Sequence, residues 1–148
     1  MIAPAVLIEQ ARQWCDPKVK FLHQGRTRHG ADCLGFIGAV LGELGSQVLL
    51  EYLPTNYPRA PQSLVLEGLT ALSREIPLQP GALIAFRWPR DAHPSHAAIY
   101  TGLNMIHCFQ REGGVIEHGY RAAWPKIAVG IWALPEVTYA CEGDSLAI

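Results

Sequence analysis

The sequence predicts an α+β domain in which N-terminal helices pack on an antiparallel β-sheet. Before Pro77, apolar residues recur at helical spacing in three segments. Beyond Pro77 the chain consists of short runs rich in β-branched and aromatic residues, each bounded by Gly, Pro or Asn. Because only a few residues separate most of these runs, neighbouring strands should pair as antiparallel hairpins and form a meander. Helices followed by strands along one chain are typical of the α+β class.

The first and third predicted helices lie next to two less regular stretches. Residues 4–15 and 63–73 carry apolar side chains at helical spacing, and we expect a helix over each. Residues 18–28 have five basic residues without a clear period, and residues 46–61 contain three prolines. We therefore predict a loop over each of these stretches.

The predicted central helix begins within the sequence GADCLG. Apolar residues at Leu34, Ile37, Leu41 and Leu44 form the stripe of a helix that buries one face, and Gly45 stands where a C-terminal cap belongs. Asp32 is the predicted N-cap. This arrangement places a cysteine in the first turn of the helix.

The predicted position of Cys33 favours a reactive thiol. Unpaired backbone N–H groups and the positive end of the helix dipole stabilise a thiolate, so we expect the pKa of Cys33 to be depressed. The alternative is a buried cysteine that acts as a small apolar side chain, as most free cysteines do. The reactive-thiol interpretation requires a base elsewhere in the sequence that could accept the proton of Cys33.

The strand pattern supplies two histidines that could act with this cysteine. The predicted strands cover residues 82–88, 97–100, 104–109, 115–117 and 128–134. His96 opens the second strand and His107 lies in the third, so a hairpin between them brings the two side chains within the roughly 5 Å range of cross-strand neighbours. His96 is the candidate base, and His107 would fix its tautomer and orientation. Either histidine alone could instead be a core or surface residue.

The remaining histidines and cysteines give no metal-binding spacing. There is no HExxH, HxxxH or paired-cysteine motif, so we predict neither a metal site nor a cofactor. The four cysteines are expected to be reduced thiols. His29 and His93 could rim a cleft, but solvated side chains are the simpler interpretation. The other two histidines, His23 and His118, complete the six in the chain.

Length, composition and charge limit the number of domains and the classes of partner that we expect. The chain has 148 residues, 49% of them hydrophobic, and a formal net charge of -1. We expect one domain over 1–148, with an irregular tail over 136–148, and neither nucleic-acid binding nor membrane insertion. Residues 1–8 have no basic segment ahead of their apolar residues, so we expect cytoplasmic synthesis without a signal peptide.

The candidate residues lie within four segments, FLHQGRTRHGADCLGFIGAVLGELG, PGALIAFRW, HAAIYTG and NMIHCF. Together these segments resemble the NlpC family of papain-like cell-wall peptidases, in particular its phage tail-associated branch. The resemblance implies a papain-like α+β fold with the nucleophile at a helix N-terminus. It also implies that Cys33 is the nucleophile, His96 the base and His107 the orienting residue. Cleavage of the γ-D-glutamyl–diaminopimelate bond of peptidoglycan stem peptides is the activity it implies.

The resemblance also indicates which residues could face the substrate. Phe21 stands at the position where the family usually has a tyrosine, so a hydroxyl contribution from that position is not expected. The substrate-binding candidates are Phe21, His23, Asp32 and Arg28. Arg28 is included because stem-peptide carboxylates are anionic.

A phage or prophage tail context implies further partners and a site of action. We expect a peptidoglycan stem peptide as substrate, other phage tail proteins as partners, and action at the cell wall from the virion tail. Two alternatives stay open. The chain could be a non-catalytic structural or adaptor protein of a tail, or a Cys–His amidase or acyltransferase that acts on a lipid or protein amide.

Overall fold

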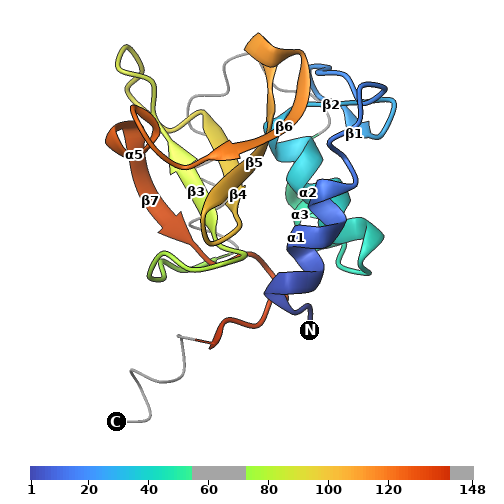
Figure 1. Ribbon diagram of the computed structural model, residues 1–148. Helices are drawn as coiled ribbons and strands as arrows, with labels where there is room; N and C mark the ends of the chain where they lie inside the picture. The colour runs from blue at the N-terminus through green and yellow to red at the C-terminus, as the bar shows by residue number, and fades with distance from the viewer. Residues whose placement is uncertain (55–72, 141–148) are drawn as a thin grey trace, which may run out of the picture.

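The helices within the first 54 residues precede the main sheet along the chain and lie on one side of it (Figure 1). The computed structural model describes residues 1–54 and 73–140. The helices in this part of the chain are α1 (Pro4–Arg12), α2 (Cys33–Glu43), α3 (Val48–Tyr52) and α5 (Trp124–Ile127), with a 3-10 turn η1 at Gln110–Glu112. The strands are β1 (Arg26–Thr27), β2 (Gly30–Ala31), β3 (Leu83–Phe86), β4 (His96–Tyr100), β5 (Asn104–Phe109), β6 (Gly114–Gly119) and β7 (Ala128–Trp132).

The main sheet has five strands in the order β6-β5-β4-β3-β7, and every neighbouring pair is antiparallel. The predicted hairpins from β3 to β6 are confirmed. The prediction of a simple meander is wrong for the last strand, because β7 pairs with β3 at the opposite edge rather than following β6. Pairing with β3 satisfies the N–H and C=O groups that this edge would otherwise leave unpaired.

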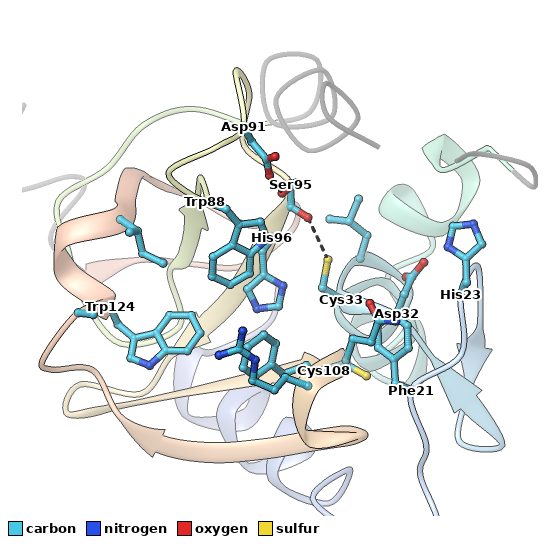
Figure 2. Close-up of a pocket in the computed structure, with 16 residues that line it drawn as sticks. Phe21, His23, Asp32, Cys33, Trp88, Asp91, Ser95, His96, Cys108 and Trp124 are labelled. Carbon is cyan, nitrogen blue, oxygen red and sulfur yellow. Dashed lines mark hydrogen bonds between the residues drawn. The ribbon is translucent and has the colours of Figure 1, made fainter. Parts of the chain in front are cut away.

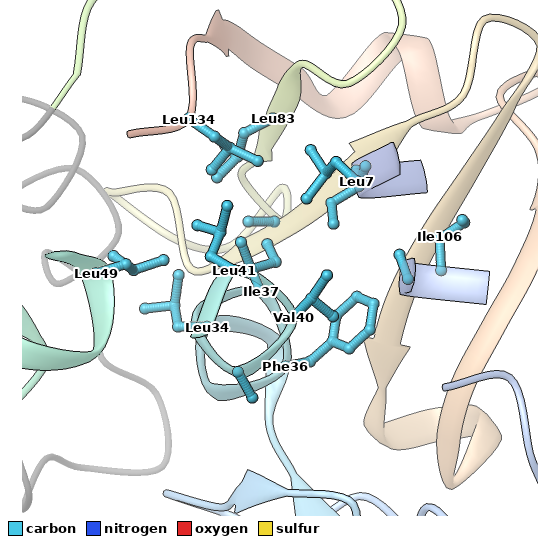
Figure 3. Close-up of a cluster of buried hydrophobic side chains, with 14 of the residues drawn as sticks. Leu7, Leu34, Phe36, Ile37, Val40, Leu41, Leu49, Leu83, Ile106 and Leu134 are labelled. Atoms are coloured by element: carbon cyan, nitrogen blue, oxygen red, sulfur yellow. The ribbon is translucent and has the colours of Figure 1, made fainter. Parts of the chain in front are cut away.

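Helix α2 is the centre of the core. Most of its side chains are apolar, and the residues from Leu34 to Leu41 are all buried. Figure 3 shows Phe36, Ile37 and Val40 extending from α2 into a cluster with side chains from α1 and the sheet. Burying this many apolar side chains is the main favourable term for folding. The helix is therefore held rigidly, and its first turn is fixed relative to β4 and β5, which it contacts.

The two faces of the sheet have different surroundings because successive side chains of a strand alternate. Ala97 and Ile99 of β4 belong to the large core that includes α2, as does Cys108 of β5. Ala98 and Met105 belong to a smaller cluster on the opposite face, which α5 and β7 help to cover. The prediction that Cys108 is a core residue is confirmed.

The ends of α2 match the sequence prediction. The Asp32 side chain accepts a hydrogen bond from the Gly35 N–H at 2.8 Å, which makes it the N-cap. Gly45 has φ of +96°, and the Ser46 N–H donates to the Leu41 carbonyl at 2.9 Å. A glycine in this left-handed conformation, followed by such a bond, is a common way to end a helix.

Other boundaries differ from the sequence prediction. Helix α1 ends at Arg12 rather than at residue 15. The predicted loops contain short elements, since β1 begins within residues 18–28 and α3 lies within residues 46–61. These elements have only two and five residues, too few to show a period. The predicted helix over residues 63–73 lies outside the described residues except for its last position.

The described part of the predicted tail, residues 136–140, has an isolated bridge between Val137 and Ile2. Within residues 1–54 and 73–140, no helix is long and apolar enough to cross a bilayer.

Candidate active site

The first turn of α2 is fixed by the loop that precedes it. The Asp32 carboxylate accepts hydrogen bonds from the backbone N–H groups of both Gly35 and Gln24, at 2.8 and 2.9 Å. Gly35 allows a close approach, because a Cβ at this position would lie 1.8 Å from the Gly25 carbonyl oxygen. The loop and the helix start therefore hold Cys33 in one place.

Cys33 opens into a cavity of about 890 Å³, which is lined by the start of α2, the start of β4, the end of β5 and α5. Its sulfur lies 3.9 Å from the carbonyl oxygen of Ser95, the residue directly before His96. Figure 2 shows Cys33 and His96 on neighbouring sides of this cavity. The other predicted residues that line it are Phe21, His23 and Asp32. The structure thus brings together the predicted nucleophile, the predicted base and three of the substrate-binding candidates.

His96 belongs to a chain of three imidazoles. Its Nε2 lies 2.7 Å from Nδ1 of His107, and Nε2 of His107 lies 2.8 Å from Nε2 of His118. Nδ1 of His118 lies 3.0 Å from the carbonyl oxygen of Gly119. The predicted contact between His96 and His107 is confirmed, and His118 is a further member that the sequence prediction did not include.

The sequence did carry a signal for His118. If the predicted turn pairs residues 104–109 with 114–119, His118 lies opposite Met105. Met105 is two residues from His107, so His107 and His118 are on the same face of the sheet. Such diagonal neighbours lie within reach of long side chains. The predicted strand over 115–117 was too short for this pairing, because the real strand β6 extends to Gly119.

Aromatic rings surround the histidines and limit their contact with water. Trp88 stacks on His96 with ring centroids 5.5 Å apart, Phe109 stacks on His107 at 5.1 Å, and the Trp124 ring lies 5.1 Å from that of His107. His96 is 5% exposed and His107 is 0% exposed. These aromatic residues are not among the site residues predicted from the sequence, since an aromatic side chain by itself is more often a core residue than a site residue.

Burial controls the protonation of the candidate pair. It lowers the pKa of His96 to about 3, and burial together with the neighbouring histidines lowers the pKa of His107 to about 2. Burial also raises the pKa of the Cys33 thiol, the Asp32 carboxylate raises it further, and backbone hydrogen bonds from Ala97 and Leu34 oppose both effects. The prediction of a depressed pKa for Cys33 is therefore wrong, because the desolvation cost of the thiolate exceeds the favourable effect of the helix start. At neutral pH the site holds a neutral thiol beside a neutral imidazole.

Comparison with known proteins identifies the fold. Neither a family model nor a curated protein sequence matches the chain. A solved structure of a lipoprotein-like NLP/P60 family protein from Staphylococcus aureus is 19% identical over 90% of this chain, with a TM-score of 0.63. An NlpC/P60 family protein from Bacillus cereus is 22% identical over 86% of this chain, with a TM-score of 0.62. The NlpC/p60 domain of the peptidoglycan hydrolase SagA is 16% identical over 88% of this chain, with a TM-score of 0.60.

The chain has the NlpC/P60 fold. The predicted papain-like α+β class is thereby confirmed. The alignments span 41% and 39% of the first two chains but 98% of the SagA domain.

Arg28 is the one substrate-binding candidate that the structure places away from the cavity. Its guanidinium donates to the two carboxylate oxygens of Glu43 at 2.9 and 3.0 Å, and it lies 5.3 Å from the centroid of the Trp14 ring. The prediction that Arg28 faces the substrate is not supported, because this ion pair holds the side chain against α2. Arg111 is the arginine that lines the cavity.

Two further histidines also lie outside this cavity. His29 and His93 are exposed and are not among its lining residues, in keeping with the solvated interpretation. In the described residues, no group of three or more His, Cys, Asp or Glu side chains is arranged to hold a metal ion.

The depressed histidine pKa values predict a stability that falls in acid. Below about pH 6.5 the unfolded chain binds protons at His96 and His107 that the folded protein does not bind until the pH approaches 3. The free energy of unfolding should therefore decrease as the pH falls from 6.5 towards 3, by at most about 1.4 kcal/mol per pH unit for each histidine. Urea denaturation between pH 4 and 8 measures this slope. A slope unchanged in the His96→Gln/His107→Gln variant would show that other groups cause it.

Proposed function

We propose that this protein is a cysteine peptidase that hydrolyses an amide bond in peptidoglycan stem peptides, with the γ-D-glutamyl–diaminopimelate bond as the expected target. The observation that carries the proposal is the geometry of Cys33 and His96. A thiol at the start of a buried helix and an imidazole held by a second imidazole line one cavity. This combination is the requirement for nucleophilic catalysis by a cysteine. The similarity in fold to the NlpC/p60 domain of a peptidoglycan hydrolase supports the substrate class.

The proposed reaction begins from the neutral pair. His96 removes the proton from the Cys33 thiol as the sulfur attacks the scissile carbonyl carbon, so the costly buried thiolate forms only during the attack. Backbone N–H groups at the start of α2, including that of Cys33, stabilise the oxyanion. His96 then protonates the leaving amine. Water, deprotonated by His96, attacks the resulting thioester, which releases the acid and restores the thiol.

The residues that line the cavity suit a peptide that carries both a negative and a positive group. Arg111 and Asp91 both line it, so a carboxylate and an ammonium group of one ligand could each find an opposite charge. Stem peptides carry both groups. Phe21 presents only an apolar ring to the cavity, so we assign it a packing role towards the substrate.

We extend the proposal to a phage or prophage tail that acts at the cell wall, with other tail proteins as partners. Support for this context comes from the sequence resemblance alone. Mass spectrometry of purified phage particles from the source strain would test it, since a tail enzyme co-purifies with the particle.

The experiment that tests the activity is incubation with purified stem peptides followed by mass spectrometry. Peptides with diaminopimelate or lysine at the third position, and with each peptide bond isotopically marked, locate the bond that is cleaved. Cys33→Ala is the matched control. No product from any stem peptide would overturn the proposal, and cleavage of a lipid or protein amide in a parallel incubation would then favour an amidase with another substrate.

Metal ions should inhibit rather than support this reaction. The proposed steps use only sulfur and imidazole, and zinc binds both groups strongly. We expect EDTA to leave stem-peptide hydrolysis unchanged or to raise it, and a few equivalents of zinc to reduce it. Loss of activity in EDTA that zinc restores would instead indicate a metal-activated water.

A further inference from the structure

His107, the orienting residue of the proposed site, can act towards His96 either as a hydrogen-bond donor or as an acceptor. A neutral imidazole has one N–H donor and one bare acceptor nitrogen, and it can exchange them. If Nδ1 of His107 is bare, it accepts from Nε2–H of His96 and leaves Nδ1 of His96 free to take a proton. If Nδ1 of His107 carries the proton, His96 must accept at Nε2 and carry its own proton on Nδ1. His107 alone therefore does not determine which nitrogen of His96 is the base.

His118, the last of the three linked imidazoles, removes this ambiguity. A carbonyl oxygen only accepts, so Nδ1 of His118 must carry the proton that is donated to Gly119 at 3.0 Å. In a neutral His118 the other nitrogen, Nε2, is then an acceptor. It lies 2.8 Å from Nε2 of His107, which must therefore be the donor.

The tautomer of His96 follows from that of His107. Because Nε2 of a neutral His107 carries the proton, its Nδ1 is bare and accepts from Nε2–H of His96 at 2.7 Å. The bare nitrogen of His96 is then Nδ1, the only ring nitrogen of the three imidazoles that these contacts leave without a partner. Within the described residues, none of the hydrogen bonds that these three imidazole rings make goes to a carboxylate.

We propose that His118 is a positioning residue of this site: bonded to the Gly119 carbonyl, it fixes the tautomer of His107 and, through it, leaves Nδ1 of His96 free to accept the Cys33 proton. The proposal rests on the proposed function for its kinetic consequence, whereas the tautomers themselves do not depend on any activity. Glu117, the charged neighbour on β6, is held on the other side of the strand by Arg12 and Asn104. The Trp124 ring lies 5.3 Å from that of His118 and offers no acceptor.

Two substitutions separate the acceptor from the space that the ring fills. His118→Phe keeps an aromatic ring beside Trp124 but gives His107 no acceptor. His118→Gln carries an amide whose NH2 group takes the place of Nδ1–H towards the Gly119 carbonyl, so that its oxygen restores the acceptor near the position of Nε2. His29→Phe is the matched control, since it removes an exposed histidine outside the cavity.

Nitrogen-15 NMR of the histidine rings reads the tautomers directly. In the parent protein we expect the proton on Nε2 of His96, on Nε2 of His107 and on Nδ1 of His118, and any other pattern overturns the proposal. In His118→Phe a second tautomer of His96, with its proton on Nδ1, should appear. It should be absent in His118→Gln and in His29→Phe.

Kinetics provide the second measurement. Since a wrong tautomer removes the base without removing the substrate site, we expect kcat of His118→Phe to fall at least about tenfold with KM unchanged. His118→Gln should retain most of the parent kcat. A His118→Phe protein with the parent tautomer of His96 and the parent kcat would overturn the proposal. If the parent cleaves no stem peptide, the proposed function fails, and the ring tautomers of the parent and of His118→Gln still decide this inference.

Discussion

Replacing Cys33 with serine should reduce the cleavage of stem peptides by at least about 10⁴-fold. The reason lies in the base rather than in the size of the side chain. Burial lowers the pKa of His96 to about 3, so this imidazole is a weak base. It removes a proton from a thiol during attack far more readily than from an alcohol, whose pKa is several units higher. Steady-state hydrolysis measured by chromatography gives kcat for parent and variant.

Two further variants decide whether the loss belongs to the nucleophile. Cys33→Ala should be as inactive as Cys33→Ser, and both should keep the parent circular dichroism, because Cys33 lies at the edge of the core rather than within it. Cys15→Ser changes an exposed thiol and should keep the parent kcat. Appreciable turnover by Cys33→Ala would remove Cys33 from the mechanism, whatever the other variants show.

The parts of the fold that sequence could predict are those set by local pattern. The stripe of apolar residues along α2, its Asp32 N-cap and Gly45 beyond its end depend only on near neighbours, and all are confirmed. The pairing of His96 with His107 was also predictable, because one short turn joins β4 and β5 and fixes which side chains meet.

The parts that sequence could not predict depend on distant contacts. The place of β7 beside β3 is determined by the free edge of a strand more than forty positions earlier. Arg28 pairs with Glu43, the last residue of the core helix, and no spacing rule distinguishes this ion pair from a role at the cavity. The pKa of Cys33 depends on how deeply the surrounding elements bury the sulfur, a property of the packed molecule rather than of a helix start.

The second large effect concerns the base. His96→Ala should lower kcat on the order of 10⁴-fold, because neither the thiol nor the attacking water then has a proton acceptor. Combining it with Cys33→Ala should cause no further loss, since the two residues act as a unit. Equal kcat in His96→Ala and the parent would show that another group takes the proton. The His29→Phe protein again controls for the removal of a histidine.

His107 should behave differently, because it acts only through His96. His107→Asn places an amide oxygen near the position of Nδ1, where it accepts from Nε2–H of His96, so we expect a kcat within about 100-fold of the parent. An asparagine side chain is too short to place a polar group at the position of Nε2 of His107, so the contact with His118 is lost and the tautomer of His96 then no longer depends on His118. Adding His118→Phe to His107→Asn should therefore cost little, although His118→Phe alone reduces kcat at least about tenfold. Full additivity of the two losses would mean that His118 acts by a route other than His107.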